Sequence, residues 1–187
     1  IDEVVIYNRA LTQDEIREEM HFTKSPASDP DLIGYWQFNR TQGLITDRSG
    51  INHASLVGAA ARVSSTAPIG TGTSKRLTVN AAGVYDFTDT DLILKFPSGI
   101  LPDGEICVSR IDAAPDQAPF NKVSPSYWVV HNYGVNDNFT ELTSLTFNNI
   151  GTVNSEMATA PDQIKLYKRE SGDCGPTWGS AQDGADA

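Results

Sequence analysis

Many short segments of this chain place apolar residues at every second position, and clusters of turn-forming residues separate these segments. Between residues 32 and 38, Leu32, Trp36 and Phe38 fall on one side and Ile33 and Tyr35 on the other. A period of two is that of a β-strand, whose successive side chains point to opposite faces. Further candidate strands are 76–79, 84–87, 92–96, 105–111, 127–133, 139–147 and 163–168. This pattern favours an all-β fold, and specifically an antiparallel β-sandwich.

The alternation also predicts part of the core. In 92–96, Leu92, Leu94 and Phe96 are expected to be buried, whereas Lys95 is expected to face water. In 139–147 one face carries Phe139, Leu145 and Phe147, with polar residues interrupting it near the start.

A single short helix is predicted close to the first residue. Thr12 and Glu15 have the spacing of a capping box, in which each side chain accepts a hydrogen bond from the other residue's backbone N–H. Leu11 and Ile16 have the spacing of a hydrophobic staple across the same turn. The helix is expected from Gln13 to Met20, because two prolines follow in 23–30.

Composition excludes two classes of partner. The chain has 187 residues, with 14 Lys and Arg against 24 Asp and Glu, a formal charge of −10. No stretch gathers basic residues into a stripe that could neutralise phosphates, so nucleic acid is not expected as a partner. No apolar run reaches the roughly 18 residues that a membrane span needs, so membrane insertion is not expected either.

Two cysteines, Cys107 and Cys174, are too few for a disulfide scaffold. Two alternatives remain open from the sequence. The cysteines pair with each other in a single disulfide, or they are independent thiols of which at least one is buried.

Two groups of residues are candidates for a binding role. Asp86, Asp89 and Asp91 lie in a predicted loop and offer the hard oxygen ligands that calcium prefers; a solvated acidic turn is the alternative. For carbohydrate, a platform needs exposed aromatic faces beside amides and carboxylates, and the alternative for such aromatics is the core. The candidates for this platform are Trp128, Asn132, Tyr133, Asn136 and Asp137.

The first sixteen residues, IDEVVIYNRALTQDEI, resemble the closing strand and short helix of laminin-G-like domains, which are concanavalin A-like jelly rolls. Residues 32–58, with GYWQF and DRSGINHASLVG, resemble the opening of a second such domain. From 61 onward, and most clearly in YWVVHNYG, the chain is similar to a β-sandwich region of large secreted proteins of Bacteroidetes type. The resemblance divides the chain into 1–24, the end of one domain, and 25–187, a jelly-roll-like sandwich whose closing strand is expected beyond Ala187.

The resemblance implies several structural and functional properties. First and last strands of a jelly roll commonly lie side by side, so 3–7 is expected to pair with 33–38; the alternative is that 1–24 trails from an upstream domain. A structural calcium is implied at Asp2, Glu3 and Asp47, which match the acidic positions of such domains. The expected localisation is secreted or at the bacterial cell surface. The expected partners are carbohydrate, a cell-surface protein and neighbouring domains of the same polypeptide.

We therefore expect a non-catalytic module for adhesion, glycan binding or spacing. The alternative is an accessory module of an exoenzyme, a glycoside hydrolase or peptidase, whose catalytic domain lies outside this fragment. Gly172–Gly175 resembles the nucleophile loop of chymotrypsin-like cysteine proteases, but too few residues follow it to build a specificity pocket. Calcium is the one cofactor that the sequence suggests.

Overall fold

The computed structural model describes residues 1–118, 123–148, 165–169, 178–179 and 182–183. The described chain consists mainly of antiparallel strands with one short α-helix, which confirms the predicted all-β class. The described residues form four small sheets, with the strand orders β1-β2, β3-β6-β7, β4-β5-β8 and β9-β10. The elements are β1 (Val4–Tyr7), α1 (Gln13–Glu19), β2 (Leu32–Trp36), β3 (Gly72–Val79), β4 (Gly83–Phe87), the 3₁₀ turn η1 (Thr88–Thr90), β5 (Leu92–Phe96), β6 (Gly104–Ile111), β7 (Tyr127–Asn132), β8 (Ser144–Phe147), β9 (Lys165–Leu166) and β10 (Gln182–Asp183).

Helix α1 begins where the capping box predicts. The Thr12 hydroxyl accepts from the Glu15 N–H at 3.2 Å, and a Glu15 carboxylate oxygen accepts from the Thr12 N–H at 2.7 Å. Two otherwise unpaired N–H groups of the first turn are thereby satisfied. The helix ends at Glu19, one residue earlier than expected, and Met20 is its C-cap.

Strands β1 and β2 pair in antiparallel fashion, which confirms the predicted pairing across the helix and linker. Val4 lies opposite Trp36, and Ile6 opposite Gly34. Strand β2 stops at Trp36 although the alternating pattern continues to Phe38. The reason is local, because Phe38 adopts a left-handed backbone conformation with φ 58°, which no strand residue can keep.

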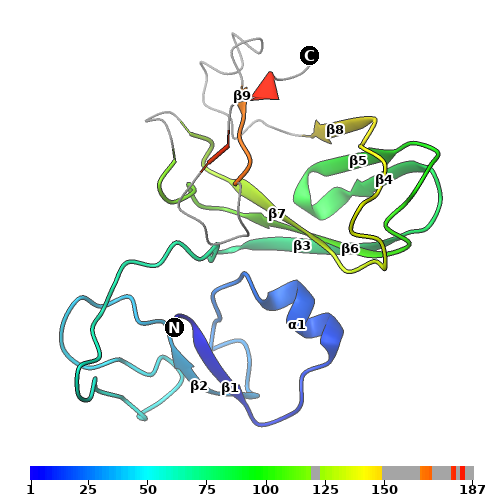
Figure 1. Ribbon diagram of the computed structural model, residues 1–187. Helices are drawn as coiled ribbons and strands as arrows, with labels where there is room; N and C mark the ends of the chain where they lie inside the picture. Colours follow the sequence, from blue (N-terminus) through cyan, green and yellow to red (C-terminus); the bar gives the residue numbers. More distant parts are fainter. Residues whose placement is uncertain (119–122, 149–164, 170–177, 180–181, 184–187) are drawn as a thin grey trace.

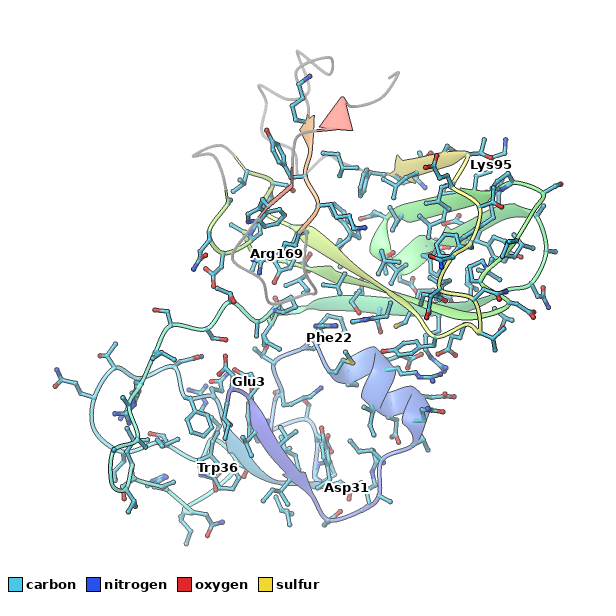
Figure 2. All side chains as sticks on the ribbon, in the orientation of Figure 1. Glu3, Phe22, Asp31, Trp36, Lys95 and Arg169 are labelled. Carbon is cyan, nitrogen blue, oxygen red and sulfur yellow. The ribbon has the colours of Figure 1, made fainter. Side chains whose placement is uncertain are left out.

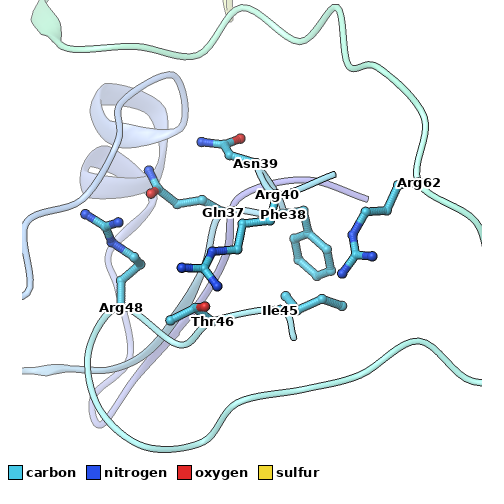
Figure 3. A pocket seen from close by; sticks show the side chains of 8 residues that line it. All are labelled: Gln37, Phe38, Asn39, Arg40, Ile45, Thr46, Arg48 and Arg62. Atoms are coloured by element: carbon cyan, nitrogen blue, oxygen red, sulfur yellow. The ribbon is translucent and has the colours of Figure 1, made fainter. Parts of the chain in front are cut away.

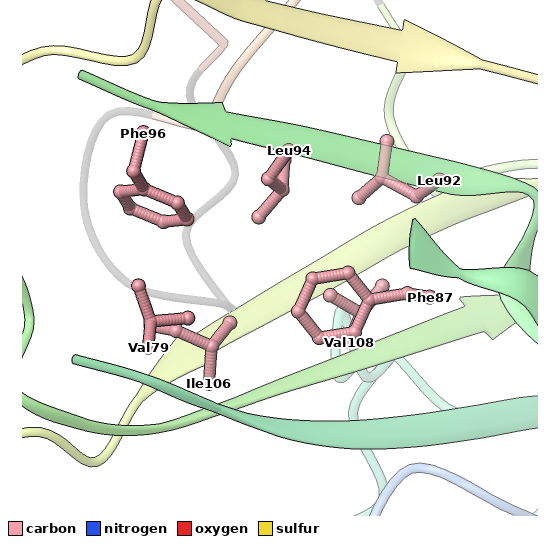
Figure 4. Close-up of a cluster of buried hydrophobic side chains, with 7 residues drawn as sticks. All are labelled: Val79, Phe87, Leu92, Leu94, Phe96, Ile106 and Val108. Carbon is pink, nitrogen blue, oxygen red and sulfur yellow. The ribbon is translucent and has the colours of Figure 1, made fainter. Parts of the chain in front are cut away.

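The two three-stranded sheets share one hydrophobic cluster (Figure 4). As predicted, Leu92, Leu94 and Phe96 are buried and Lys95 is exposed. Phe139, Leu145 and Phe147 also pack against this cluster, but only 144–147 is a strand. Hydrogen bonding of this segment to β5 begins only at Thr143, whose N–H donates to the Lys95 carbonyl at 2.8 Å. The fully packed members are Val79, Phe87, Leu92, Leu94, Phe96, Ile106 and Val108.

The opposite face of the β3-β6-β7 sheet is covered by the N-terminal segment, with α1 beneath β3 and β6 in Figure 1. Alternate residues of β6 face this cover, and Cys107, Ser109 and Ile111 are all fully buried. Backbone bonds tie the two parts together, from the Thr23 N–H to the Gly70 carbonyl and from the Gly70 N–H to the His21 carbonyl. Residues 1–24 are therefore packed on the rest of the chain.

Ion pairs fasten α1 to the same sheet. Arg17 contacts Glu105 of β6 at 2.8 Å. Arg76 of β3 contacts Asp14 at 2.9 Å and Glu18 at 2.7 Å. Arg17, Arg76 and Glu105 are largely shielded, whereas Asp14 and Glu18 are exposed, so the pairs fix where the helix lies more than they add to net stability.

Truncation of the shared core is expected to destabilise the fold. Leu94→Ala removes a side chain that is 2% exposed, and we expect it to lower the free energy of unfolding by about 2 to 4 kcal/mol. Val84→Ala on the neighbouring strand is the control, because Val84 is 63% exposed and should change stability by about 0.5 kcal/mol or less. Urea denaturation at pH 7 measures both, and equal effects would contradict this core assignment.

Candidate functional site

The structure does not bring the predicted carbohydrate platform together on one face. Trp128 lies on β7, whereas Tyr133 directly follows the strand, an odd number of residues further on, and the two side chains contact opposite sides of the sheet. The Trp128 indole donates to the Thr90 carbonyl at 2.6 Å and its ring packs on Phe147 with centroids 4.6 Å apart. The Tyr133 ring instead lies under the Arg17 guanidinium, 4.0 Å from its centroid, on the side of α1. Both aromatic faces are thus used in packing.

The amides predicted beside that platform build a turn. The Asn132 side chain bonds the Asn136 carbonyl and the Gly134 N–H, at 2.8 and 2.9 Å. The Asn136 side chain donates to the Leu101 carbonyl at 2.7 Å. Asp137 is exposed beyond this turn.

The six acidic residues predicted as calcium ligands do not form a cation site. Asp86 and Asp89 point to solvent, whereas Asp91 is paired with Arg110. Glu3 accepts from the Tyr35 hydroxyl, and Asp2 accepts from the Glu3 N–H at 3.1 Å. Within the described ranges, no group of three or more His, Cys, Asp or Glu side chains is arranged to hold a metal ion.

Of the two cysteines, Cys107 is a free thiol buried under α1, where its sulfur contacts the Arg17 carbonyl at 3.5 Å. For Cys107 the structure thus shows the buried-thiol alternative. Burial, helped by Glu105 and Glu18, raises the pKa of the Cys107 thiol to about 11. A neutral thiol is a poor nucleophile, so Cys107 is not a reactive cysteine. Cys174 and the rest of Gly172–Gly175 lie outside the described residues.

The feature that sequence reasoning missed is a pocket lined by three arginines, here called the arginine pocket (Figure 3). It lies beside the end of β2 and has a cavity volume of about 60 Å³. The loop after β2, the segment before Asp47 and the distant residue Arg62 together form its walls. Its lining residues are Gln37, Phe38, Asn39, Arg40, Ile45, Thr46, Arg48 and Arg62.

The arginines of this pocket are not neutralised by the fold. Within the described residues, Arg40 and Arg48 make no side-chain hydrogen bond or ion pair. Arg62 donates to the Gly43 carbonyl at 2.6 Å, and its Nε is buried without a partner. An unsatisfied buried donor costs about 1 to 3 kcal/mol, which an added acceptor would recover.

Asp47 lies in the chain between Thr46 and Arg48, two lining residues of the pocket, and does not line it itself. It is 3% exposed. One carboxylate oxygen accepts from the Tyr35 N–H at 3.0 Å and from the Ser49 N–H at 2.9 Å, and the other accepts from the Asn52 N–H at 3.2 Å. Burial alone would raise the pKa of Asp47, but these hydrogen bonds outweigh it and lower the pKa to about 2. Asp47 is therefore ionised and structural, and its bond to Tyr35 ties the loop that contains Arg48 to β2.

Charge distribution was the available sequence signal for this pocket. Residues 37–62 contain three arginines and one acidic residue, a net charge of 3 − 1 = +2, so the rest of the chain carries −10 − 2 = −12. Since Asp47 is sealed behind the wall, the pocket is a local positive site in an acidic protein. Arg40, Arg48 and Arg62 all lie outside the helices and strands, so a search for periodic patterns could not reveal the pocket.

A larger hollow of about 590 Å³ lies between β1 and α1. Three of its acidic side chains already have partners, since Glu3 bonds Tyr35, Glu15 bonds Arg9 and Glu19 bonds Lys24. It therefore presents less unsatisfied polar chemistry than the arginine pocket.

Comparison with protein-family models, curated proteins and solved structures finds no match for this chain. The resemblance to laminin-G-like domains thus stays a prediction. No helix of the described part is long and apolar enough to cross a membrane.

Removing the Asp47 carboxylate is expected to destabilise the loop that carries Arg48. Asp47→Ala leaves buried N–H groups unsatisfied, and we expect the free energy of unfolding at pH 7 to fall by about 2 to 4 kcal/mol. Asp47→Asn keeps the oxygen that bonds Tyr35 and Ser49 and should cost about half as much. Urea denaturation of the three proteins measures the difference.

The effect of Asp47 should also depend on pH. Because the folded-state pKa of about 2 lies below the ordinary value of 3.8, the stabilisation is complete above about pH 5 and is lost as the pH falls towards 2. The stability difference between the natural chain and Asp47→Ala should shrink over that range. A difference that is constant from pH 7 to pH 2.5 would contradict the assigned role.

Proposed function

We propose that this chain is a non-catalytic β-sandwich module of a secreted or cell-surface protein, and that its arginine pocket binds a carboxylate group on a glycan. The observation that carries the proposal is the pocket itself, which three arginine side chains line without a carboxylate partner from the described chain. Planar guanidinium groups match carboxylate geometry and form charge-assisted hydrogen bonds with it.

Electrostatics favour a ligand with isolated charges over a polyanion. The chain outside 37–62 carries −12, so a strongly charged polymer would be repelled over most of the surface. A cavity of about 60 Å³ admits one small anionic group. A carboxylated sugar fits both conditions, because its negative charge is spaced by neutral hydroxyls.

The other lining residues suit the rest of a sugar ring. Phe38 supplies an apolar wall, and Gln37, Asn39 and Thr46 supply groups that can bond hydroxyls. Phe38 is also held at φ 58°, an unusual conformation for an aromatic residue of the kind that clusters at functional sites.

Several further observations support the module as a whole. Two sheets share one core, as a β-sandwich requires, and β1 pairs with β2 as in a jelly roll. The resemblance of residues 1–16 and 32–58 to laminin-G-like domains supports a secreted or cell-surface location.

Binding of a glucuronate-terminated oligosaccharide tests the proposal, with the glucose-terminated analogue as the neutral control ligand. Arg40→Met and Arg62→Met should each weaken glucuronate binding by about tenfold or more, because each removes a charge-assisted hydrogen bond. Arg9→Met is the control variant, since Arg9 is already paired with Glu15 and Asp31 away from the pocket. Calorimetric titration at low and high salt measures the affinities.

Equal affinity for the two oligosaccharides would overturn the carboxylate assignment. If Tyr133→Leu abolished binding and Arg40→Met did not change it, the binding site would be the predicted aromatic platform around Trp128 and Tyr133 and not the arginine pocket. A Kd that increases with salt for the glucuronate ligand alone is the remaining expected result.

A further inference from the structure

The hollow between β1 and α1 has the size of a small-molecule site. Its volume of about 590 Å³ lies within the range of ligand pockets in proteins. Every second residue from Glu3 to Arg9 lines it, so the hollow follows one face of β1 along the whole strand. In Figure 2, Glu3 lies at one end of this strand, and Asp31, which pairs with Arg9, lies near the other end.

Apolar side chains from both elements line the hollow. Val5 and Tyr7 come from β1, whereas Ile16 and Met20 come from α1 and its C-cap. Ile16 and Met20 are four residues apart and therefore lie on one face of the helix, where they are 50% and 41% exposed. Large apolar side chains that stay exposed around one hollow mark a place where an apolar group can bind.

The charges that line the hollow do not balance. Four carboxylates face two cations, a net charge of 2 − 4 = −2, from Glu3, Glu15, Glu19 and Asp29 against Arg9 and Lys24. Arg9 is paired with Glu15 and Lys24 with Glu19, both at 2.7 Å. Within the described residues, Glu3 and Asp29 form no ion pair, although Asp29 accepts from the Asp31 N–H at 3.1 Å. A ligand with a positive charge is therefore favoured over a neutral or negative one.

The same negative charge acts on groups inside the hollow. Burial, and then the charge of Asp29, raise the pKa of the Tyr7 hydroxyl. Burial also raises the pKa of Glu3, and a cation nearby would oppose that effect by favouring the ionised carboxylate. The Asp29 charge thus reaches the aromatic residue on the opposite wall.

We propose that this hollow binds a small organic cation, whose apolar body carries a single ammonium group. The body packs between Tyr7 on β1 and Ile16 and Met20 on the helix side. The ammonium group lies towards Asp29, the lining carboxylate of the linker that follows α1. This site shares no lining residue with the arginine pocket, so the two proposals stand or fall separately.

Three indoles of nearly equal shape test the proposal, because they differ mainly in charge. Tryptamine is positive, tryptophol is neutral and indole-3-propionate is negative at pH 7. We expect tryptamine to bind about threefold or more tightly than tryptophol, and indole-3-propionate to bind most weakly. Nitrogen-15 NMR titration of the full chain measures the three affinities, and the largest shifts are expected at backbone N–H groups in 3–29.

Asp29→Asn tests the charge. It keeps an oxygen for the Asp31 N–H, so it should abolish the preference for tryptamine and leave tryptophol binding within about twofold. Asp86→Asn is the matched control, because it makes the same change of charge at an exposed residue of β4 and should retain the preference.

Ile16→Gln tests the apolar wall at an exposed helix position. We expect it to weaken the binding of all three indoles by about threefold or more, since it removes apolar contact area. Ile100→Gln is its control, because Ile100 is 60% exposed and does not line the hollow.

The proposal would be overturned by equal affinities for tryptamine and tryptophol, or by a preference for tryptamine that survives Asp29→Asn. Analytical ultracentrifugation tests a different occupant, a second copy of this chain. A dimer of the natural chain that dissociates in Ile16→Gln but not in Ile100→Gln would show that the hollow is an interface between copies, which would also overturn the proposal.

Discussion

Burial of β6 on both faces is the constraint on which the rest of the structure depends. One set of its residues, Ile106 and Val108, joins the core shared with β4, β5 and β8. The alternate set, led by Cys107 and Ile111, is sealed by α1 and the residues that follow the helix. A half-exposed antiparallel sheet would carry polar residues at the second set, so this sequence requires a cover. The N-terminal segment is that cover, although in sequence it resembles the end of another domain.

The arginine pocket depends on a second buried polar group. Arginine side chains can stay unpaired only where water or a ligand reaches them, and the exposed Arg40 and Arg48 meet this condition. Two contacts hold the loop that contains Arg48. The ionised Asp47 ties the loop to β2 through its hydrogen bonds, and the Trp36 indole donates to the Asn52 carbonyl at 2.9 Å. The backbone that carries Arg48 is thereby held in place, so a ligand has to order only the arginine side chain.

Interactions between residues close in the sequence could be predicted, whereas interactions between distant residues could not. The capping box of α1 and the alternation of β5 are local, and both were predicted nearly to the residue. The end of β2 depends on the left-handed Phe38, which no pattern signals. The sequence predicts a calcium ligand at Asp91, but its partner Arg110 comes from another part of the chain, the strand β6. The pocket gathers arginines from three separate positions and is visible in the sequence only as a local excess of positive charge.

The opposite orientation of Trp128 and Tyr133 is different, because strand parity alone already requires it. Their proximity in sequence concealed that they serve different layers. Trp128 closes the core against Phe147, and Tyr133 supports Arg17 above the other face.

The end of the N-terminal segment and the loop beside the arginine pocket both form hydrogen bonds with Tyr35 of β2. Three residues after His21, the Lys24 N–H donates to the Tyr35 hydroxyl at 3.1 Å. The same tyrosine donates its backbone N–H to Asp47, and its carbonyl accepts from the Arg48 N–H at 2.7 Å. Burial and the bond to Glu3 raise the pKa of Tyr35 to about 12, so its hydroxyl keeps its proton through the range in which histidines titrate. Any movement of residues 20–24 must therefore either break the Lys24 bond or move Tyr35, the residue on which the pocket wall rests. The N-terminal segment and the pocket loop thus rest on the same residue of β2. Such a shared contact is the physical requirement for coupling between them.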